Sequence, residues 1–193
     1  MAIVKIRAID ALIVVDMQND FMPGGALPVE NALTIIPTIN EYLKIFNDSA
    51  AVIVATRDWH PPNHISFNTR GGPWPPHCIQ GSKGAEFHPL LKLPSSAIVV
   101  SKAIDENREA YSGFDSTELE SVLRRRGVKR VFVCGVATEY CVRATAIDAM
   151  KLGFQTHILI DAIKGIDRVR SEEVMNELLN CGSIALEIKD LRR

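Results

Sequence analysis

The sequence predicts an α/β fold, a three-layer αβα sandwich in which helices cover both faces of a mostly parallel central sheet. Short apolar runs rich in Val, Ile and Leu recur along the chain, as is typical of strands buried on both faces. Segments with apolar residues at helical spacing alternate with these runs. This alternation of strands and helices is the pattern of a parallel sheet with helical crossovers.

Six apolar runs are predicted to be strands. They are Ala11–Asp16, Ala51–Thr56, Ala97–Ser101, Arg130–Gly135, Gln155–Ile160 and a weaker Ser183–Glu187. The predicted helices are Leu33–Phe46, Ser116–Arg126, Glu139–Leu152 and Arg168–Leu179. The second and third helices end before Gly127 and Gly153, because glycine readily caps a helix C-terminus.

Length and charge limit the class of protein. The 193 residues favour one domain over residues 1–193. Lys and Arg number 22 and Asp and Glu number 23, so we expect no nucleic-acid or membrane partner. The apolar N-terminus is interrupted by Lys5, Arg7 and Asp10, which argues against a signal peptide, and no segment is long enough to cross a bilayer. We therefore expect a soluble cytoplasmic protein with free thiols.

Reactive side chains fall at or just after four predicted strand ends. Asp16 ends the first strand, Asp58 follows the second, Lys102 follows the third and Cys141 follows the fourth. In open α/β sheets, ligands bind beyond the carboxyl ends of the strands. The sequence therefore predicts one shared site at this edge of the sheet. The long stretch 58–94, which is rich in Pro, Gly and His, is predicted to be a functional loop beside it.

Cys141 is the candidate nucleophile, since it lies where a strand passes through a small-residue turn into a helix. The helix dipole would favour its thiolate, and free backbone N–H groups there could stabilise an oxyanion. Asp16 could take the thiol proton, and Lys102 could stabilise the thiolate and pair with Asp16. The structural alternatives are a buried apolar Cys141, a turn residue at Asp16 and a solvated Lys102.

The other three thiols are given no chemical role. Cys134 is expected in the core, Cys181 is expected to be structural, and Cys78 is expected to point away from the site.

Asp58, His60 and His77 are the candidate metal ligands. Asp58 and His60 are alternate residues, which share one face of an extended segment, and His77 could return to complete the set. Two imidazoles and one carboxylate suit zinc, iron or manganese and leave open coordination positions. His64 is a candidate fourth ligand and His88 a weaker one. The alternative is that these histidines only decorate a loop.

These motifs resemble those of the isochorismatase-like hydrolases. The matching segments are DMQNDF at Asp16–Phe21, RDWH at Arg57–His60, Pro76–Cys78, Lys102 and GVATEYC at Gly135–Cys141. They occur in the family's order over nearly the whole chain. The histidine loop is typical of the metal-dependent nicotinamidase branch and separates it from the isochorismatases that work without metal.

The resemblance implies a role for each motif residue. It implies a catalytic triad of Asp16, Lys102 and Cys141, and a divalent metal, with zinc expected first, on Asp58, His60 and His77. It implies a cis peptide before Ala137 and an oxyanion hole from the amides of Ala137 and Cys141. Phe21 and Trp74 match positions that stack on a pyridine ring, and Tyr111 matches a further pocket position, with ordinary packing as the alternative. The charged segment Ala103–Ala110 departs from the family and could alter the pocket rim.

The implied activity is hydrolysis of nicotinamide or pyrazinamide to the acid and ammonia, through a thioester on Cys141, in a homo-oligomer. Two alternatives stay open. One is another hydrolase of the same family, such as a carbamoyl-amide amidase or an isochorismatase. The other is an inactive relative that only binds small molecules, although the chain keeps all three triad residues.

Overall fold

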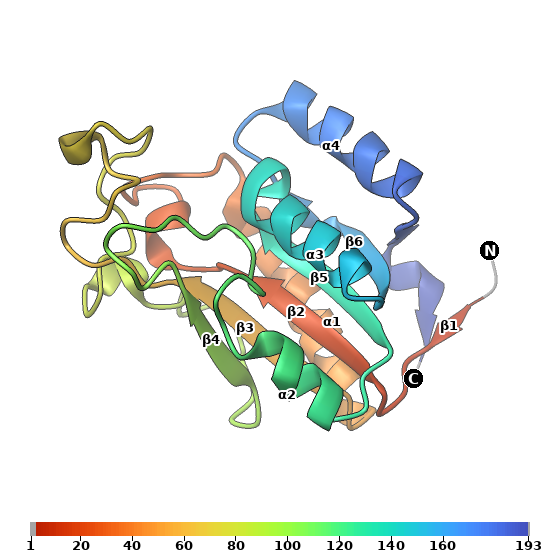
Figure 1. Ribbon diagram of the computed structural model, residues 1–193. Coiled ribbons are helices and arrows are strands. Elements are labelled where there is room, and N and C mark those ends of the chain that lie inside the picture. Colours follow the sequence, from red (N-terminus) through yellow and green to blue (C-terminus); the bar gives the residue numbers. More distant parts are fainter. Residues whose placement is uncertain (1–2, 193) are drawn as a thin grey trace.

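The computed structural model describes residues 3–192 and contains a six-stranded sheet in the order β4-β3-β2-β5-β6-β7 (Figure 1). The strands are β2 Asp10–Val15, β3 Val52–Asp58, β4 Ile98–Lys102, β5 Arg130–Val136, β6 Gln155–Lys164 and β7 Ile184–Leu186. Every neighbouring pair is parallel. The predicted parallel sheet is therefore confirmed.

Helices cover both faces of this sheet, which confirms the three-layer prediction (Figure 1). Helix α1 (Ile36–Asp48) packs on one face, and α2 (Leu119–Arg125), α3 (Arg143–Lys151) and α4 (Arg168–Asn180) pack on the other. Successive side chains of a strand point to opposite faces, so Leu12 and Val14 of β2 join the core under α1. Ile13 and Val15 join the other core. Burial on both faces explains why the strands are continuously apolar.

Some element boundaries differ from the prediction for local reasons. The helix expected over Leu33–Phe46 starts as the 3₁₀ turn Ala32–Ile35 and becomes α-helical at Ile36, where Pro37 occupies the first turn. The helix expected from Ser116 starts only at Leu119, because Ser116 has φ of 57°, outside the helical region.

Three strand features were not predicted. Strand β6 continues past Ile160 to Lys164, beyond a register shift against β5. Strands β1 (Val4–Lys5) and β8 (Leu191–Arg192) pair in parallel and tie the two ends of the chain together (Figure 1). The remaining 3₁₀ turns are Asn19–Phe21, Asn68–Arg70, Lys83–Ala85 and Ile188–Asp190.

Within residues 3–192, no helix is long and apolar enough to span a bilayer.

The long segment between β3 and β4 lies beyond the carboxyl ends of these strands, at the left of Figure 1. It has little regular structure but is held by its own contacts. The backbone N–H of His60 donates to the carbonyl of Cys78 at 3.0 Å, and that of Gln80 donates to the carbonyl of His60 at 2.8 Å. Phe67, which belongs to this segment, is fully buried. The segment therefore presents its histidines in fixed positions above the sheet edge.

Candidate active site

Asp16, Lys102 and Cys141 meet at the carboxyl edge of the sheet. Asp16 directly follows β2, Lys102 is the last residue of β4, and Cys141 lies in the π-helical turn Thr138–Val142 after β5. Lys102 Nζ lies 2.9 Å from Asp16 Oδ2 and donates a hydrogen bond to Cys141 Sγ at 3.3 Å. Lys102 is only 1% exposed, so it is not a solvated surface lysine.

Lys102 carries its positive charge in spite of this burial. Burial lowers the pKa of its ammonium group, but the carboxylates of Asp16 and Asp58 outweigh this effect and raise the pKa of Lys102 well above its usual value. Its Nζ also donates to Asp58 Oδ1 at 2.5 Å and to the carbonyl of Ala110 at 3.4 Å. A permanent cation therefore stands next to the sulfur of Cys141.

Burial and the neighbouring charges act on the pKa of Cys141 in opposite directions. Burial raises the pKa of its thiol well above the ordinary value; Lys102 opposes this, and the charges of Asp16 and Asp58 add to it. Cys141 lies in the first turn of the helical stretch after β5, as predicted, but this turn, Thr138–Val142, is π-helical and leads directly into α3 at Arg143. A neighbour that accepts the thiol proton would therefore favour formation of the thiolate.

Asp16 is placed to be that acceptor. Its Oδ1 accepts a hydrogen bond from Thr56 Oγ1 at 2.7 Å. Its buried Oδ2 accepts no hydrogen bond from the described residues, because Lys102 Nζ approaches it outside hydrogen-bond geometry. Burial raises the pKa of Asp16, with Lys102 opposing the rise. A carboxylate with a raised pKa and a free lone pair can both take and return a proton.

Asp58, His60 and His77 form a second cluster, which contacts the group of Asp16, Lys102 and Cys141 through Asp58. Their ligand atoms lie within 4.8 Å of one another, and all three side chains are buried. The Nδ1 of His60 is hydrogen-bonded to the carbonyl of His77 at 3.0 Å, and the Nδ1 of His77 to the carbonyl of Pro75 at 2.8 Å. Since a carbonyl only accepts, each Nδ1 carries the hydrogen. The Nε2 lone pair of both rings is therefore free, which is the tautomer that binds a metal.

The charge states of this cluster also fit a divalent cation. Burial lowers the pKa of His60 to about 4, so its imidazole is neutral at pH 7. Burial opposes ionisation of Asp58, but Lys102, His60 and His77 together hold the pKa of its carboxyl group below the ordinary value. Neutral imidazole and ionised carboxylate are the forms that coordinate zinc, iron or manganese.

The two further histidines considered as ligands differ from this pair. Both ring nitrogens of His64 are already engaged, with Ser66 Oγ at 2.8 Å and with the carbonyl of Arg108 at 2.9 Å. His64 therefore joins the metal loop, the segment 58–94, to the segment after β4, although one of its ring nitrogens also lies within 4.8 Å of His60 and Glu109. The Nδ1 of His88 accepts from the N–H of Leu90, and His88 does not line the pocket described next.

A small pocket, with about 360 Å³ of space including its open mouth, connects the two clusters. The lining residues predicted from the sequence are Phe21, Asp58, His60, Trp74, His77, Tyr111, Ala137 and Cys141. Leu27, Glu109, Tyr140 and Ile166 complete the lining and were not predicted. The mostly apolar lining with a few polar groups suits one small ring compound.

Four aromatic side chains line this pocket, those of Phe21, Trp74, Tyr111 and Tyr140. Trp74 Nε1 donates to the hydroxyl of Tyr111 at 3.0 Å. The ring of Tyr140 lies edge-on to Trp74 with centroids 5.0 Å apart, and Phe21 lies edge-on to His77 at 5.5 Å. The three predicted aromatics thus face the pocket, and Tyr140, one residue before Cys141, joins them. Their contact with a substrate ring stays a prediction.

The backbone around the nucleophile has the geometry that the resemblance implied. The peptide bond between Val136 and Ala137 is cis, as predicted. Gly135 has φ of 110°, and a Cβ on it would lie 2.1 Å from the carbonyl oxygen of Val15. Only glycine therefore allows β5 to approach β2 so closely at this point.

Three buried or half-buried polar residues of the motifs hold loops in place, a role that the sequence did not reveal. Gln18 donates to the carbonyls of Asp58 and Ala85 and accepts from the N–H of Asp58. Asp20 accepts from the N–H of Cys78, next to His77, at 2.7 Å.

Glu139 is the third of these residues. Its Oε1 accepts from the N–H groups of Ile166 and Asp167 at 2.8 and 2.7 Å, which fixes the loop after β6 to the nucleophile turn. The position of these residues inside recognised motifs was the only available signal.

The remaining thiols lie outside the pocket lining. Cys134 is buried in β5, as predicted. Cys78 is also buried, and its pKa is raised well above the ordinary value, mainly by burial. Cys181, which was expected to be structural, is exposed at the end of α4.

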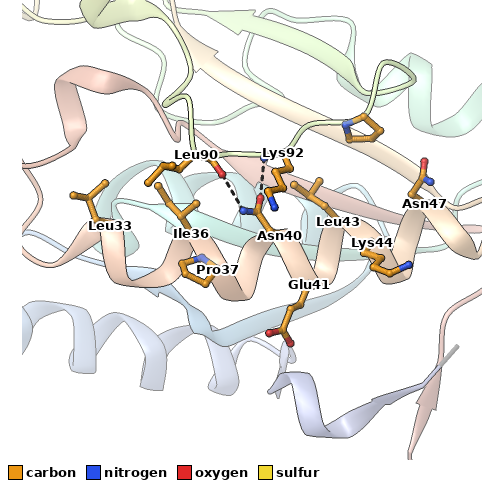
Figure 2. A pocket seen from close by; sticks show the side chains of 11 residues that line it. Leu33, Ile36, Pro37, Asn40, Glu41, Leu43, Lys44, Asn47, Leu90 and Lys92 are labelled. Atoms are coloured by element: carbon orange, nitrogen blue, oxygen red, sulfur yellow. Dashed lines mark hydrogen bonds between the residues drawn. The ribbon is translucent and has the colours of Figure 1, made fainter.

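A larger groove lies on the outer face of α1 (Figure 2). The side-chain amide of Asn40 binds the backbone of the segment before β4 there. It donates a hydrogen bond to the carbonyl of Leu90 and accepts one from the N–H of Lys92. In the part of the chain that the structure describes, none of the predicted site residues lines this groove. The predicted chemistry therefore belongs to the smaller pocket at the strand ends.

A parallel sheet with its polar groups gathered at the carboxyl ends of the strands is the organisation of an α/β enzyme. The model of the isochorismatase domain matches residues 10–190, and the chain belongs to this family. The resemblance found in the motifs is thereby confirmed.

Relatives and solved structures agree with this assignment. A nicotinamidase of Acinetobacter baylyi is 43% identical over 195 residues, which cover 89% of this chain and 89% of that protein. The crystal structure of a pyrazinamidase of Pyrococcus horikoshii in complex with zinc is similar with a TM-score of 0.91 and 56% identity, over 93% of this chain and 99% of that one. PnC1 from L. infantum in complex with nicotinate has a TM-score of 0.91 and 38% identity, over 100% and 99% of the two chains.

Proposed function

We propose that this protein is a metal-dependent cysteine amidohydrolase that converts nicotinamide to nicotinic acid and ammonia. The observation that carries the proposal is the contact of one buried ammonium, that of Lys102, with the sulfur of Cys141 and the carboxylate of Asp16. This group opens into the pocket that also holds His60 and His77. The similarity to a nicotinamidase and a pyrazinamidase supports the choice of substrate.

In the first half of the reaction, Asp16 Oδ2 accepts the proton of the Cys141 thiol. Lys102 stabilises the thiolate, which adds to the carboxamide carbon. The amides of Ala137 and Cys141 stabilise the resulting oxyanion. The C–N bond then breaks, the amide nitrogen takes the proton from Asp16, and ammonia leaves a thioester on Cys141.

In the second half, a water molecule adds to the thioester carbon and gives a proton to Asp16. The C–S bond breaks, the sulfur takes back that proton, and the acid is released. Asp16 thus acts as base in each addition and as acid in each elimination, which its raised pKa favours. Lys102 keeps its charge throughout, because its pKa is raised far above neutrality.

Asp58, His60 and His77 would hold the divalent cation. When bound, that cation supplies a Lewis acid for the ring nitrogen of the substrate and for water. Phe21 and Trp74 would contact the two faces of the ring, and Tyr140 supports Trp74 from the side. Holding the ring fixes the carboxamide next to Cys141, and such positioning supplies much of the rate enhancement.

Ammonia release from nicotinamide by the zinc-loaded protein tests the proposal, together with mass spectrometry of acid-quenched reactions. We expect turnover, and an adduct of the nicotinoyl group on Cys141. Cys141→Ala should abolish both, while Cys181→Ala, which removes the exposed thiol, should retain both. Turnover by Cys141→Ala would refute the nucleophile assignment.

The competing activities are separated by substrate. Carbamoyl amides and isochorismate should react at least about 100-fold more slowly than nicotinamide, since their shape does not suit a narrow aromatic pocket. Faster turnover of either would show that the protein is another hydrolase of the family. Binding of nicotinamide without ammonia release would show that it is an inactive relative.

A further inference from the structure

Glu109 lines the pocket but has no part in the proposed mechanism. It is half-buried in the segment between β4 and α2. One of its carboxylate oxygens lies within 4.8 Å of ring nitrogens of both His60 and His64. Its Oε1 accepts a hydrogen bond from the N–H of Ala110 at 2.9 Å.

No basic side chain among the described residues neutralises the charge of Glu109. The arginines around this segment are paired with other residues, Arg70 with Glu106 and Arg108 with Asp115. Among residues 3–192, no lysine or arginine forms an ion pair with Glu109. Partial burial of a carboxylate without an ion pair costs free energy, which makes a role of Glu109 in the pocket worth testing.

The fixed charges of the site suit an uncharged ligand. Asp16, Asp58 and Glu109 contribute three negative charges, and Lys102 contributes one positive charge. A divalent cation on the ligand cluster brings this sum to zero. A neutral carboxamide leaves the balance unchanged, whereas an anionic ligand adds a charge of the same sign next to Glu109.

We propose that Glu109 is a specificity-determining residue that selects uncharged amides over amides carrying a carboxylate. The same charge should weaken binding of the carboxylate product and so favour its release. The identity of the neutral substrate rests on the proposed function. Two like charges that approach each other in a partly buried site repel strongly enough to change relative rates by about tenfold or more.

The test compares three amides on each protein variant: nicotinamide, nicotinamide with a carboxylate at ring position 5, and the methyl ester of that carboxylate. The ester has the bulk of the anionic compound without its charge, so the rate ratio of acid to ester isolates the charge. The ratio is measured as kcat/KM for the wild type, Glu109→Gln and Glu106→Gln. Glu106 is the matched control, because it lies in the same segment but its side chain is 48% exposed and it does not line the pocket.

We expect the ratio of acid to ester to rise about tenfold or more in Glu109→Gln and to stay at the wild-type value in Glu106→Gln. The inhibition constant of nicotinate, relative to the KM of nicotinamide, should fall in the same variant. An unchanged ratio in Glu109→Gln, or an equal rise in Glu106→Gln, would overturn the proposal.

A wrong assignment of the proposed function would give a different experimental result. If the wild type releases no ammonia from nicotinamide, the relative affinities for the acid and the ester, measured by titration calorimetry, still decide the role of Glu109. The same measurement applies if Glu109→Gln folds but loses turnover.

Discussion

Replacing Gln18 by Leu should loosen the metal loop without touching a metal ligand. The side-chain amide of Gln18 is fully buried and holds the backbone of Asp58 from both sides, accepting from its N–H at 2.8 Å and donating to its carbonyl at 2.8 Å. It also donates to the carbonyl of Ala85 at 3.0 Å. Leu has a similar volume, so the substitution removes the hydrogen bonds and little of the packing.

The magnitude follows from the three backbone groups left without this partner. A buried polar group that loses its hydrogen bond costs about 1–3 kcal/mol. Three such groups, offset in part by the apolar burial of Leu, should lower the free energy of unfolding by about 4 kcal/mol. With an m-value of about 2 kcal/mol/M, the urea midpoint of the metal-free protein should fall by about 2 M.

Urea unfolding and zinc competition against a chelator measure the two consequences of Gln18→Leu. We expect the lower midpoint and at least about tenfold weaker zinc binding, because Asp58 is no longer held in register with His60. Asn40→Leu is the control, since Asn40 makes two similar backbone contacts on the solvent-exposed side of α1, far from the ligands. Equal effects of the two substitutions, or unchanged zinc affinity in Gln18→Leu, would refute the role of Gln18.

Three further predictions address the backbone, the pH dependence and the ligand set. Gly135→Ala should prevent stable folding as judged by near-UV circular dichroism, because its Cβ would lie 2.1 Å from a carbonyl oxygen; Gly153→Ala, also at positive φ but in open space, should cost only about 1 kcal/mol. Burial, and then Arg130, lowers the pKa of His157 from 6.5 to about 4, so between these values only the unfolded chain takes up the proton. The free energy of unfolding should therefore fall from pH 6.5 to pH 4, by about 3 kcal/mol more in the wild type than in His157→Gln, as measured by urea unfolding. His77→Ala should lose bound zinc in elemental analysis, whereas His64→Ala should retain it, because both ring nitrogens of His64 are engaged.

The grouping of the site residues at the strand ends was predictable, because residues at the carboxyl ends of adjacent parallel strands lie close together in space. Asp16, Asp58 and Lys102 each follow or end an apolar run, and adjacent parallel strands bring such positions to one edge. The sequence could not show that Lys102 is buried, since a lysine at the end of an edge strand usually reaches solvent. Its burial results from the loop packed over the edge, and loops carry no periodicity that reveals their path.

The direction in which the pKa of Cys141 shifts was hard to predict for a related reason. A cysteine near a predicted helix N-terminus suggests a thiolate, but the chain inserts a π-helical turn there and starts α3 two residues after the sulfur. Carboxylate oxygens of Asp16 and Asp58 lie within 4.8 Å of the sulfur, and the ammonium of Lys102 lies 3.3 Å from it. The sign of the pKa shift depends on this balance of distances, which spacing along the chain does not contain.

Glu109 and Gln18 show two different limits of prediction from sequence. Glu109 stands in a segment with four charged residues, and nothing in its spacing distinguishes the one that turns to the pocket from those that face solvent. Gln18 stands inside a recognised motif, yet its partners are backbone groups 40 and 67 residues away. Any residue type can supply a backbone N–H or carbonyl, so the sequence at the partner position does not reveal such a contact.

Asp58 joins the two halves of the site into one electrostatic unit. One of its oxygens pairs with Lys102 Nζ at 2.5 Å, and the same oxygen lies 4.0 Å from His60 Nε2. Lys102 in turn holds the sulfur of Cys141. A change in charge at the histidine cluster therefore changes the interaction of Asp58 with the ammonium of Lys102. This in turn changes how strongly the ammonium stabilises the thiolate of Cys141. A substitution in the metal loop should accordingly change the rate at which an alkylating reagent modifies Cys141, even where no substrate is present. Substitutions elsewhere in the fold that lower the free energy of unfolding by the same amount should leave this rate unchanged.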